Sequence, residues 1–329
     1  MNPTILLVDA DSTNCGGWKT FLQNLKCDVY EAEDGESAVR CSRQIQPDLI
    51  LLHNSLPDIG SFELCHRLKQ EPVNQFTPIV LVKPSPEQWD IQRGREAGAI
   101  DVWATPSSLW DVLDRVQTLL RLKNYMDGQL KSMVLSLARV VDAKQATRNG
   151  HSERLVTYAE QLGECFDLGE EDLRELRIAC WLHDIGKIAV PDEILLKPGP
   201  LNAEEMRIVR QHPVIGEKMC APVKSLRCIL PVIRHHHERM DGSGYPDGLR
   251  GEAIPLKVRI LQVADIYDAL TTDRPYREAL TPEEAMQTLF REAGNGWLDA
   301  ALVFKFFDHC QPFPCHPVRG RSMLASYYA

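Results

Sequence analysis

The sequence predicts two domains, an N-terminal α/β domain with a doubly wound parallel sheet and a C-terminal domain made of helices. Short apolar runs at residues 4–8, 48–52 and 78–82 alternate with stretches of helical periodicity in the N-terminal part of the chain. Such alternation is typical of buried parallel strands joined by helices. From residue 125 onward no clear strand pattern is found and apolar residues recur at helical spacing, which indicates an all-α bundle.

The stretches with helical periodicity in the first domain are residues 15–25, 35–45 and 60–70. In an open parallel sheet, functional side chains gather at the carboxyl ends of the strands. Asp9 directly follows the first apolar run and His53 directly follows the second. We therefore expect these two side chains at one edge of the sheet.

Residues 107–146 contain no proline, and their apolar residues recur at three- and four-residue steps on both sides of Gly128. This pattern predicts the last helix of the first domain running into a second helix, with Gly128 as a break or hinge. The apolar stripe would either cover the domain's own core or join two copies in a homodimer. We divide the chain into a first domain at 1–122, a helical linker at 123–146 and a second domain at 147–329.

The composition limits the classes of function. The chain has 329 residues, of which 44% are hydrophobic and 25% charged, and its formal net charge is −9. The negative charge argues against a nucleic-acid polymer as partner, because proteins that bind such polymers usually have a basic excess. No run of 18 apolar residues and no secretory signal is found, so we expect a cytoplasmic protein with no membrane partner.

Side chains that bind metals recur along the predicted helices of the second half. Mixed imidazole and carboxylate ligands suit first-row transition metals such as Fe, Mn or Ni. Neighbouring residues on a helix point about 100° apart, so His183 and Asp184 can reach two sides of a metal cluster. The side chains assigned to one site are His151, His183, Asp184, His212, two of the three histidines at 235–237, and Asp265.

This set of ligands predicts phosphoester hydrolysis. Two ions about 3.5–4 Å apart polarise a phosphoryl oxygen and lower the pKa of a bridging water, whose hydroxide attacks phosphorus in line. Lys187 shares a helix face with His183 and Asp184, and would stabilise a phosphate oxygen or help protonate the leaving group. Asp184 and Lys187 are therefore the predicted catalytic residues.

Four segments of the first domain match a known family: ILLVDAD, PDLILLHNSLPDIGSFELCHRLK, TPIVLVK and AGAIDVWATP. They resemble the successive strand ends of response-regulator receiver domains, whose fold is flavodoxin-like. The resemblance implies a Mg²⁺-binding acidic pair, a phosphoacceptor Asp, a Ser or Thr, and a Lys. At four of these places the chain instead has Ala10, His53, Lys83 and Thr105.

These replacements remove the chemistry of the receiver. Mg²⁺ needs carboxylate oxygens, and His53 cannot form an acyl phosphate. Asp11 and Asp58 lie out of the expected register. We expect a receiver that cannot be phosphorylated and that docks a partner protein, senses another signal, or serves as a folded spacer or dimerisation element.

Five segments of the second half also match a known family: HSERL, LHDIGKIAVPDEILLKPGPL, QHPVIGE, HHERMDGSGYPDGLRGEAIPL and RILQVADIYDALTTDRPYR. They resemble the HD-GYP family of metal phosphohydrolases, and the GYP triplet is intact at residues 244–246. The resemblance implies that Lys187, Tyr245, Arg274 and Arg277 contact the substrate, and that His235 stays outside the metal site. The implied metal ligands are His151, His183, Asp184, His212, His236, His237 and Asp265.

The resemblance also implies a substrate and a number of ions. Family members with a third metal have a Glu where this chain has Thr147, so we expect two divalent ions. The implied substrate is cyclic di-GMP, with pGpG or GMP as the product. Alternatives are another cyclic dinucleotide, a general nucleotide phosphohydrolase, and a nucleotide-binding scaffold without turnover. Asp268 and Glu238 would either orient a metal ligand or serve as surface or capping residues.

Overall fold

The computed structural model describes residues 2–53, 56–104, 109–144, 150–273 and 278–309. The chain divides into two compact units. Unit 1 comprises Met1–Val134 and Lys218–Arg227, and unit 2 comprises Leu135–Glu217 and Cys228–Ala329. The domain limits at 122 and 146 stay a prediction.

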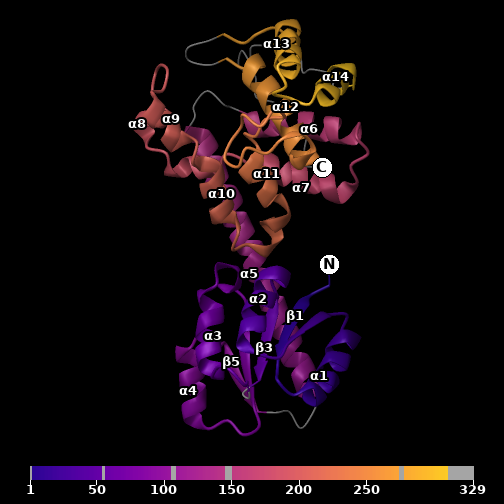
Figure 1. The fold of residues 1–329 in the computed structure, drawn as a ribbon, viewed down its shortest axis with the longest axis vertical. Coiled ribbons are helices and arrows are strands. Elements are labelled where there is room, and N and C mark those ends of the chain that lie inside the picture. Colours follow the sequence, from indigo (N-terminus) through magenta and orange to yellow (C-terminus); the bar gives the residue numbers. More distant parts are fainter. Residues whose placement is uncertain (1, 54–55, 105–108, 145–149, 274–277, 310–329) are drawn as a thin grey trace, which may run out of the picture. The chain divides into compact units, whose positions relative to one another are not determined.

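Unit 1 contains a five-stranded parallel sheet in the order β2-β1-β3-β4-β5, which confirms the predicted α/β class (Figure 1). Its strands are β1 (Thr4–Val8), β2 (Asp28–Ala32), β3 (Leu49–His53), β4 (Ile79–Lys83) and β5 (Asp101–Ala104). The three apolar runs of the sequence are β1, β3 and β4, the inner strands of this sheet. The two edge strands have more polar sequences, DVYEA and DVWA, and periodicity predicted neither of them. The resemblance to receivers did imply a strand end in AGAIDVWATP, which contains β5.

Helices cover both faces of the sheet. They are α1 (Ser12–Asn24), α2 (Gly35–Ile45), α3 (Ser61–Gln70), α4 (Gln88–Glu96) and α5 (Leu109–Lys144), with a 3₁₀ turn at Pro72–Asn74. Alternate strand residues face opposite layers because side chains alternate along a strand. Ile5 and Leu7 pack with α1 and α5, whereas Leu6 and Val8 pack with α2 and α3.

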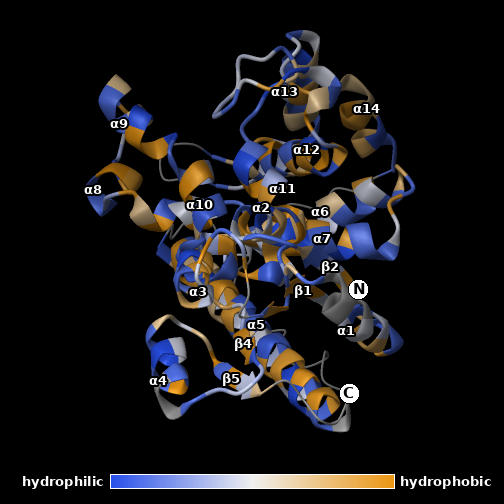
Figure 2. Ribbon diagram, turned by 60° about the horizontal axis from the view of Figure 1, so that its bottom comes forward, coloured by the Kyte–Doolittle hydropathy of each residue, from blue (hydrophilic) through white to orange (hydrophobic). Residues whose placement is uncertain are grey.

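Helix α5 is continuous over 36 residues, so the predicted break at Gly128 is wrong. Gly128 lies inside the helix, where an added Cβ would meet nothing within 4 Å. A single helical glycine costs only about 1 kcal/mol relative to alanine, which the rest of a long helix can offset. Figure 2 shows hydrophobic and hydrophilic residues alternating along α5. Its Val112 and Val116 lie in the core of unit 1.

Unit 2 is helical, as predicted, and its described residues contain no strand. Its helices are α6 (His151–Glu164), α7 (Glu170–Leu182), α8 (Asp192–Leu195), α9 (Ala203–Val209), α11 (Leu230–His235), α12 (Leu256–Thr271), α13 (Pro282–Gly294) and α14 (Ala300–His309). Helix α10 (His212–Cys220) begins in unit 2, and 3₁₀ turns occupy Ile185–Ala189, Lys224–Ile229 and Gly251–Ala253. Helix α12 packs against α6, α7, α11, α13 and α14 and so forms the centre of this bundle.

Three aromatic rings fill the core beside α12. Tyr267 contacts Tyr158 and Phe306 with ring centroids 5.2 Å and 4.9 Å apart, in edge-on arrangements. These contacts join α12 to α6 and α14, and such geometry is preferred by aromatic pairs. Among the described residues, no helix is long and apolar enough to cross a membrane.

The carboxyl edge of the sheet in unit 1 has a His–Asp pair in place of the acidic site that receivers use. His53 ends β3, and its Nδ1 lies 3.3 Å from Oδ2 of Asp9, which follows β1. Burial lowers the pKa of His53, although the charge of Asp9 opposes the shift. Lys83 ends β4 and donates to Oδ1 of Asp90 at 2.5 Å. Asp58 accepts from the backbone N–H of Gly35 at 3.0 Å, at the start of α2.

We predict that acetyl phosphate and Mg²⁺ do not phosphorylate this protein, because an imidazole stands where the acyl phosphate would form. Intact-mass spectrometry should find no phosphoryl adduct on the full chain. An adduct that is lost in an Asp9→Asn or Asp58→Asn variant would show that another carboxylate has taken over the role, contrary to this account.

Candidate metal centre

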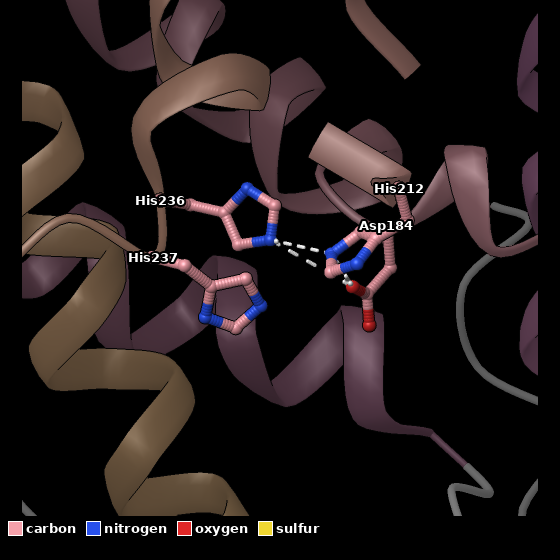
Figure 3. Close-up of side chains that lie close together, drawn as sticks. All are labelled: Asp184, His212, His236 and His237. Carbon is pink, nitrogen blue, oxygen red and sulfur yellow. Dashed lines mark hydrogen bonds and ion pairs between the residues drawn. The ribbon is translucent and has the colours of Figure 1, made fainter. Parts of the chain in front are cut away.

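Unit 2 brings all seven predicted ligands together in two groups. The first group is Asp184, His212, His236 and His237, shown in Figure 3, and the second is His151, His183 and Asp265. Within each group, one potential ligand atom per residue lies within 4.8 Å of the others. Mixed imidazole and carboxylate groups at this spacing are suited to holding divalent transition metals.

Most of these side chains are placed by the ends of helices. His151 and His212 are the first residues of α6 and α10, and His183 and His236 directly follow α7 and α11. Asp265 alone lies in the interior of a helix, α12. Helix ends leave backbone carbonyl and N–H groups without partners inside the helix, so a polar side chain can be satisfied there.

The Asp184 carboxylate lies between the two groups. Its Oδ1 is 3.3 Å from Nε2 of His212 and 3.8 Å from Nε2 of His236, both in the first group. Its Oδ2 is 3.5 Å from Nε2 of His183, in the second group. One oxygen therefore faces each group, which is the arrangement that a bridging carboxylate needs.

Backbone carbonyls determine which nitrogen of three imidazoles is protonated. Nδ1 of His183, His212 and His236 lies 2.9, 2.7 and 2.7 Å from the carbonyl oxygen three residues earlier. A carbonyl can only accept, so Nδ1 must donate, and Nε2 of a neutral ring then presents its lone pair to the site. The accepting carbonyls belong to the last turns of α7, α9 and α11.

A carboxylate plays the same role for His151. Nδ1 of His151 lies 2.6 Å from Oδ2 of Asp268, one turn after Asp265 on α12. Arg154 holds Asp268 in place through Nε at 2.5 Å and Nη2 at 3.1 Å. Asp268 therefore orients a candidate ligand, which is the first of the two roles that the sequence left open.

The buried histidines are arranged to stay neutral. Burial, together with neighbouring histidines, holds the pKa of His236 and that of His237 well below the ordinary value. Burial also lowers the pKa of His183. Nε2 of His212 and Nε2 of His236 lie 3.1 Å apart while Nδ1 of each ring donates to a carbonyl, so the two Nε2 atoms converge on one point. A cation at that point could accept both lone pairs, so the donor set fits a metal.

Lys187 lies beside the shared carboxylate. Its Nζ donates to Oδ2 of Asp184 at 2.6 Å from the 3₁₀ turn that follows. The Lys187 side chain is 12% exposed, so its ammonium group is mostly buried beside Asp184. The predicted closeness of Lys187 and Asp184 is therefore present. The predicted shared helix face is wrong, because α7 ends at Leu182 and Lys187 lies in the 3₁₀ turn at Ile185–Ala189.

A glycine allows the turn that holds Asp184 to approach α10. A Cβ at Gly186 would lie 2.0 Å from the carbonyl oxygen of His212 and 2.6 Å from the backbone N of Gly216. Both neighbours are backbone atoms, so they cannot move aside as a side chain would. Gly186 is thus required for Asp184 and His212 to lie in one group.

The GYP loop packs over the first group. The Tyr245 ring stacks on the His237 ring with centroids 4.9 Å apart, and the Arg210 guanidinium lies 5.2 Å from the Tyr245 centroid. Burial raises the pKa of Tyr245, so its phenol keeps its proton. At Gly244, a Cβ would lie 2.4 Å from the backbone of Glu238, which explains the glycine of the motif.

Glu238 supports this loop. Its carboxylate accepts from the backbone N–H groups of Asp247, Gly248 and Leu249 at 2.7, 3.1 and 3.0 Å. Glu238 therefore caps the loop and does not orient a ligand, which is the second alternative that the sequence left open. The role of Arg210 was missed, because no motif links it to Tyr245.

Three further expectations concern residues around the metal groups. His235 lies outside both groups and its Nε2 contacts Oδ2 of Asp247 at 2.9 Å. Arg274 and Arg277, the expected substrate contacts, lie outside the described residues and stay predictions.

Comparison with known proteins agrees with this geometry. Residues 136–302 match the HD domain family, and residues 5–117 match the response regulator receiver domain. The chain belongs to the HD-domain family. It is 34% identical over 290 residues to the cyclic di-GMP phosphodiesterase response regulator RpfG of Xanthomonas campestris, covering 81% of this chain and 77% of that one.

Two other relatives of this HD-domain protein are informative. A cyclic di-GMP phosphodiesterase of Thermotoga maritima is 30% identical over 336 residues, covering 92% of this chain and 89% of the relative. The 3'3'-cGAMP-specific phosphodiesterase 3 of Vibrio cholerae is 36% identical over 179 residues, covering 54% of this chain and 39% of the relative. Both are named as phosphodiesterases of cyclic dinucleotides. The first name gives a substrate with two guanine bases, and the second gives one with a guanine and an adenine.

We predict that Gly186→Ala lowers both the metal content and the unfolding midpoint of the protein. The added methyl group must push the turn that holds Asp184 away from α10, and such overpacking costs about 1–3 kcal/mol. Gly294→Ala is the matched control, because a Cβ there meets nothing within 4 Å. Elemental analysis and thermal unfolding measure the two effects. Equal metal content and stability in both variants would contradict the packing account.

Proposed function

We propose that this chain is a metal-dependent phosphodiesterase that hydrolyses cyclic di-GMP to pGpG, GMP or both. The observation that supports it best is the Asp184 carboxylate, which has one oxygen toward each group of imidazoles. A bridging carboxylate between two ligand groups is what a two-ion hydrolytic site needs. The relatives named as cyclic di-GMP phosphodiesterases also match most of the chain, covering 81% of it for the Xanthomonas protein and 92% for the Thermotoga protein.

The proposed site holds two divalent transition-metal ions such as Fe, Mn or Ni. One ion would be held by His212, His236 and His237 and the other by His151, His183 and Asp265, with Asp184 shared. Bound ions would polarise a phosphoryl oxygen and acidify water. The protein's contribution is to fix the tautomers of the imidazoles through the helix-end carbonyls and Asp268.

Lys187 and Tyr245 are the proposed substrate contacts among the described residues. In the reaction, the oxygen of water bonds to phosphorus and the bond to the leaving 3′ oxygen breaks. The Lys187 ammonium, 2.6 Å from Asp184, would face the phosphate and supply a proton to that oxygen. The Tyr245 phenol stays protonated and can donate to a phosphate oxygen. Arg274 and Arg277 would complete the phosphate contacts.

The receiver unit is proposed to regulate the enzyme or dock a partner without phosphorylation. Its strand ends present the His53–Asp9 pair where a phosphoacceptor would stand. Tyr125 and Met133 on α5 are 66% and 62% exposed, so this helix offers apolar contacts for a partner protein or a second copy. Neither feature requires a phosphoryl group.

We predict that the purified protein contains divalent metal and hydrolyses cyclic di-GMP in the presence of Mn²⁺ or Fe²⁺. Asp184→Ala should lower turnover by at least ~100-fold, because loss of even an outer contact at a metal site costs about 10–100-fold. Asp308→Ala, at an exposed position on α14, is the control and should keep full activity. Liquid chromatography of the products measures the rates.

Three results would contradict this proposal. Metal and nucleotide binding without turnover would indicate a scaffold, and absence of bound metal would remove the basis of both functions. Unchanged turnover in Asp184→Ala would show that the shared carboxylate is not part of the reaction.

A further inference from the structure

A cavity of about 280 Å³ lies next to the metal groups in unit 2. His236, His237 and Asp265 line it together with Glu238, Gln262 and two apolar side chains, and so do Arg239, Glu292 and Trp297. None of these last three residues has a part in the proposed hydrolysis. The cavity is close to the ~300 Å³ lower limit of ordinary ligand pockets, which suits one base of a larger ligand.

Backbone hydrogen bonds hold the cavity walls together. The N–H of Met240 donates to the carbonyl of Trp297 at 3.1 Å, and the N–H of Trp297 donates to the carbonyl of Glu292 at 3.0 Å. Residues more than 50 positions apart in the sequence are thereby fixed side by side. The Trp297 ring and its polar neighbours are therefore positioned before any ligand enters.

Two charged side chains of this cavity, Glu292 and Arg239, can form hydrogen bonds with a ligand. Glu292 is partly buried, and within the described part of the chain its carboxylate accepts no hydrogen bond. The Arg239 guanidinium lies 4.1 Å from the centroid of the Trp297 ring. Among the described residues it forms no ion pair, so its N–H groups remain available at the rim.

These three side chains match the groups of guanine. Guanine offers O6 and N7 as acceptors, which pair with a guanidinium in a two-point contact. Its N1–H and N2–H₂ are donors on the Watson–Crick edge, which a carboxylate can accept together. An indole ring stacks on any base. Adenine has an acceptor at N1, which the Glu292 carboxylate would repel. Its donor at N6 would likewise be repelled by the Arg239 guanidinium.

We propose that this cavity binds a guanine base of the substrate, with Glu292 on its Watson–Crick edge, Arg239 on O6 and N7, and Trp297 against its face. This inference rests on the proposed function, because it places the base beside the site of phosphodiester hydrolysis. It assigns the choice between guanine and adenine to residues that do not bind the metals. The relatives named for cyclic di-GMP and for 3'3'-cGAMP make that choice a meaningful one.

The test compares Glu292→Gln and Arg239→Gln with the parent metal-loaded enzyme. Each variant should raise KM for cyclic di-GMP by roughly tenfold with little change in kcat, because one two-point contact is lost. Hydrolysis of bis(p-nitrophenyl) phosphate, which has no base, should stay at the parent rate. The matched controls are Glu283→Gln and Arg291→Gln. Both residues are exposed and lie on α13, the helix that also carries Glu292, and both variants should behave as the parent.

Calorimetric binding of GMP and AMP separates this inference from the proposed function. A parent preference for GMP that disappears in Glu292→Gln supports the guanine pocket, even if the parent proves unable to hydrolyse cyclic di-GMP. Parent values of KM and an unchanged GMP preference in both variants would overturn it, even with full cyclic di-GMP hydrolysis. A rate loss on bis(p-nitrophenyl) phosphate equal to that on cyclic di-GMP would also overturn it, since the effect would then be on the metal site.

Discussion

The helical unit buries imidazole nitrogens and carboxylate oxygens close together, and a positive charge between them would stabilise this arrangement. Two imidazole nitrogens lie 3.1 Å apart at His212 and His236, with an Asp184 oxygen 3.3 Å from the first. Burial of His236 and His237 disfavours the protonated forms that would otherwise relieve the crowding. Divalent cations would supply that positive charge, and their binding would then contribute to the folding free energy of this unit.

The helices serve this arrangement through their ends. A helix leaves its last carbonyls without partners inside the helix, and at α7, α9 and α11 such a carbonyl accepts from an imidazole Nδ1. One contact thus satisfies the helix end, selects the tautomer and aims Nε2 inward. Close approach of the backbones, permitted by Gly186 and Gly244, then brings the separate helix ends within reach of one another.

The two units differ in how much of their family chemistry they keep. Unit 1 keeps the sheet and core of a receiver, while its strand ends have His53 against Asp9 and Lys83 against Asp90. Unit 2 brings all seven predicted ligands together in two groups that could hold metal ions.

Sequence reasoning succeeded where local pattern and burial coincide. The inner strands β1, β3 and β4 are buried on both faces, so their apolar runs were visible, whereas the half-exposed edge strand β2 was not. The spacing of Asp268 from Asp265 offered ligand orientation as one of two alternatives, because one helical turn places both on the same face. The loop capped by Glu238 and the cavity lined by both Glu292 and Arg239 depend on distant segments meeting, which no local spacing encodes.

The most direct test of the shared carboxylate is the electron paramagnetic resonance spectrum of the protein loaded with Mn²⁺. The account predicts two Mn²⁺ ions per chain with a spin-coupled spectrum, because a carboxylate placed between two ligand groups brings the ions close enough to interact. A spectrum of isolated Mn²⁺ at full loading, or a stoichiometry of one ion per chain, would contradict it.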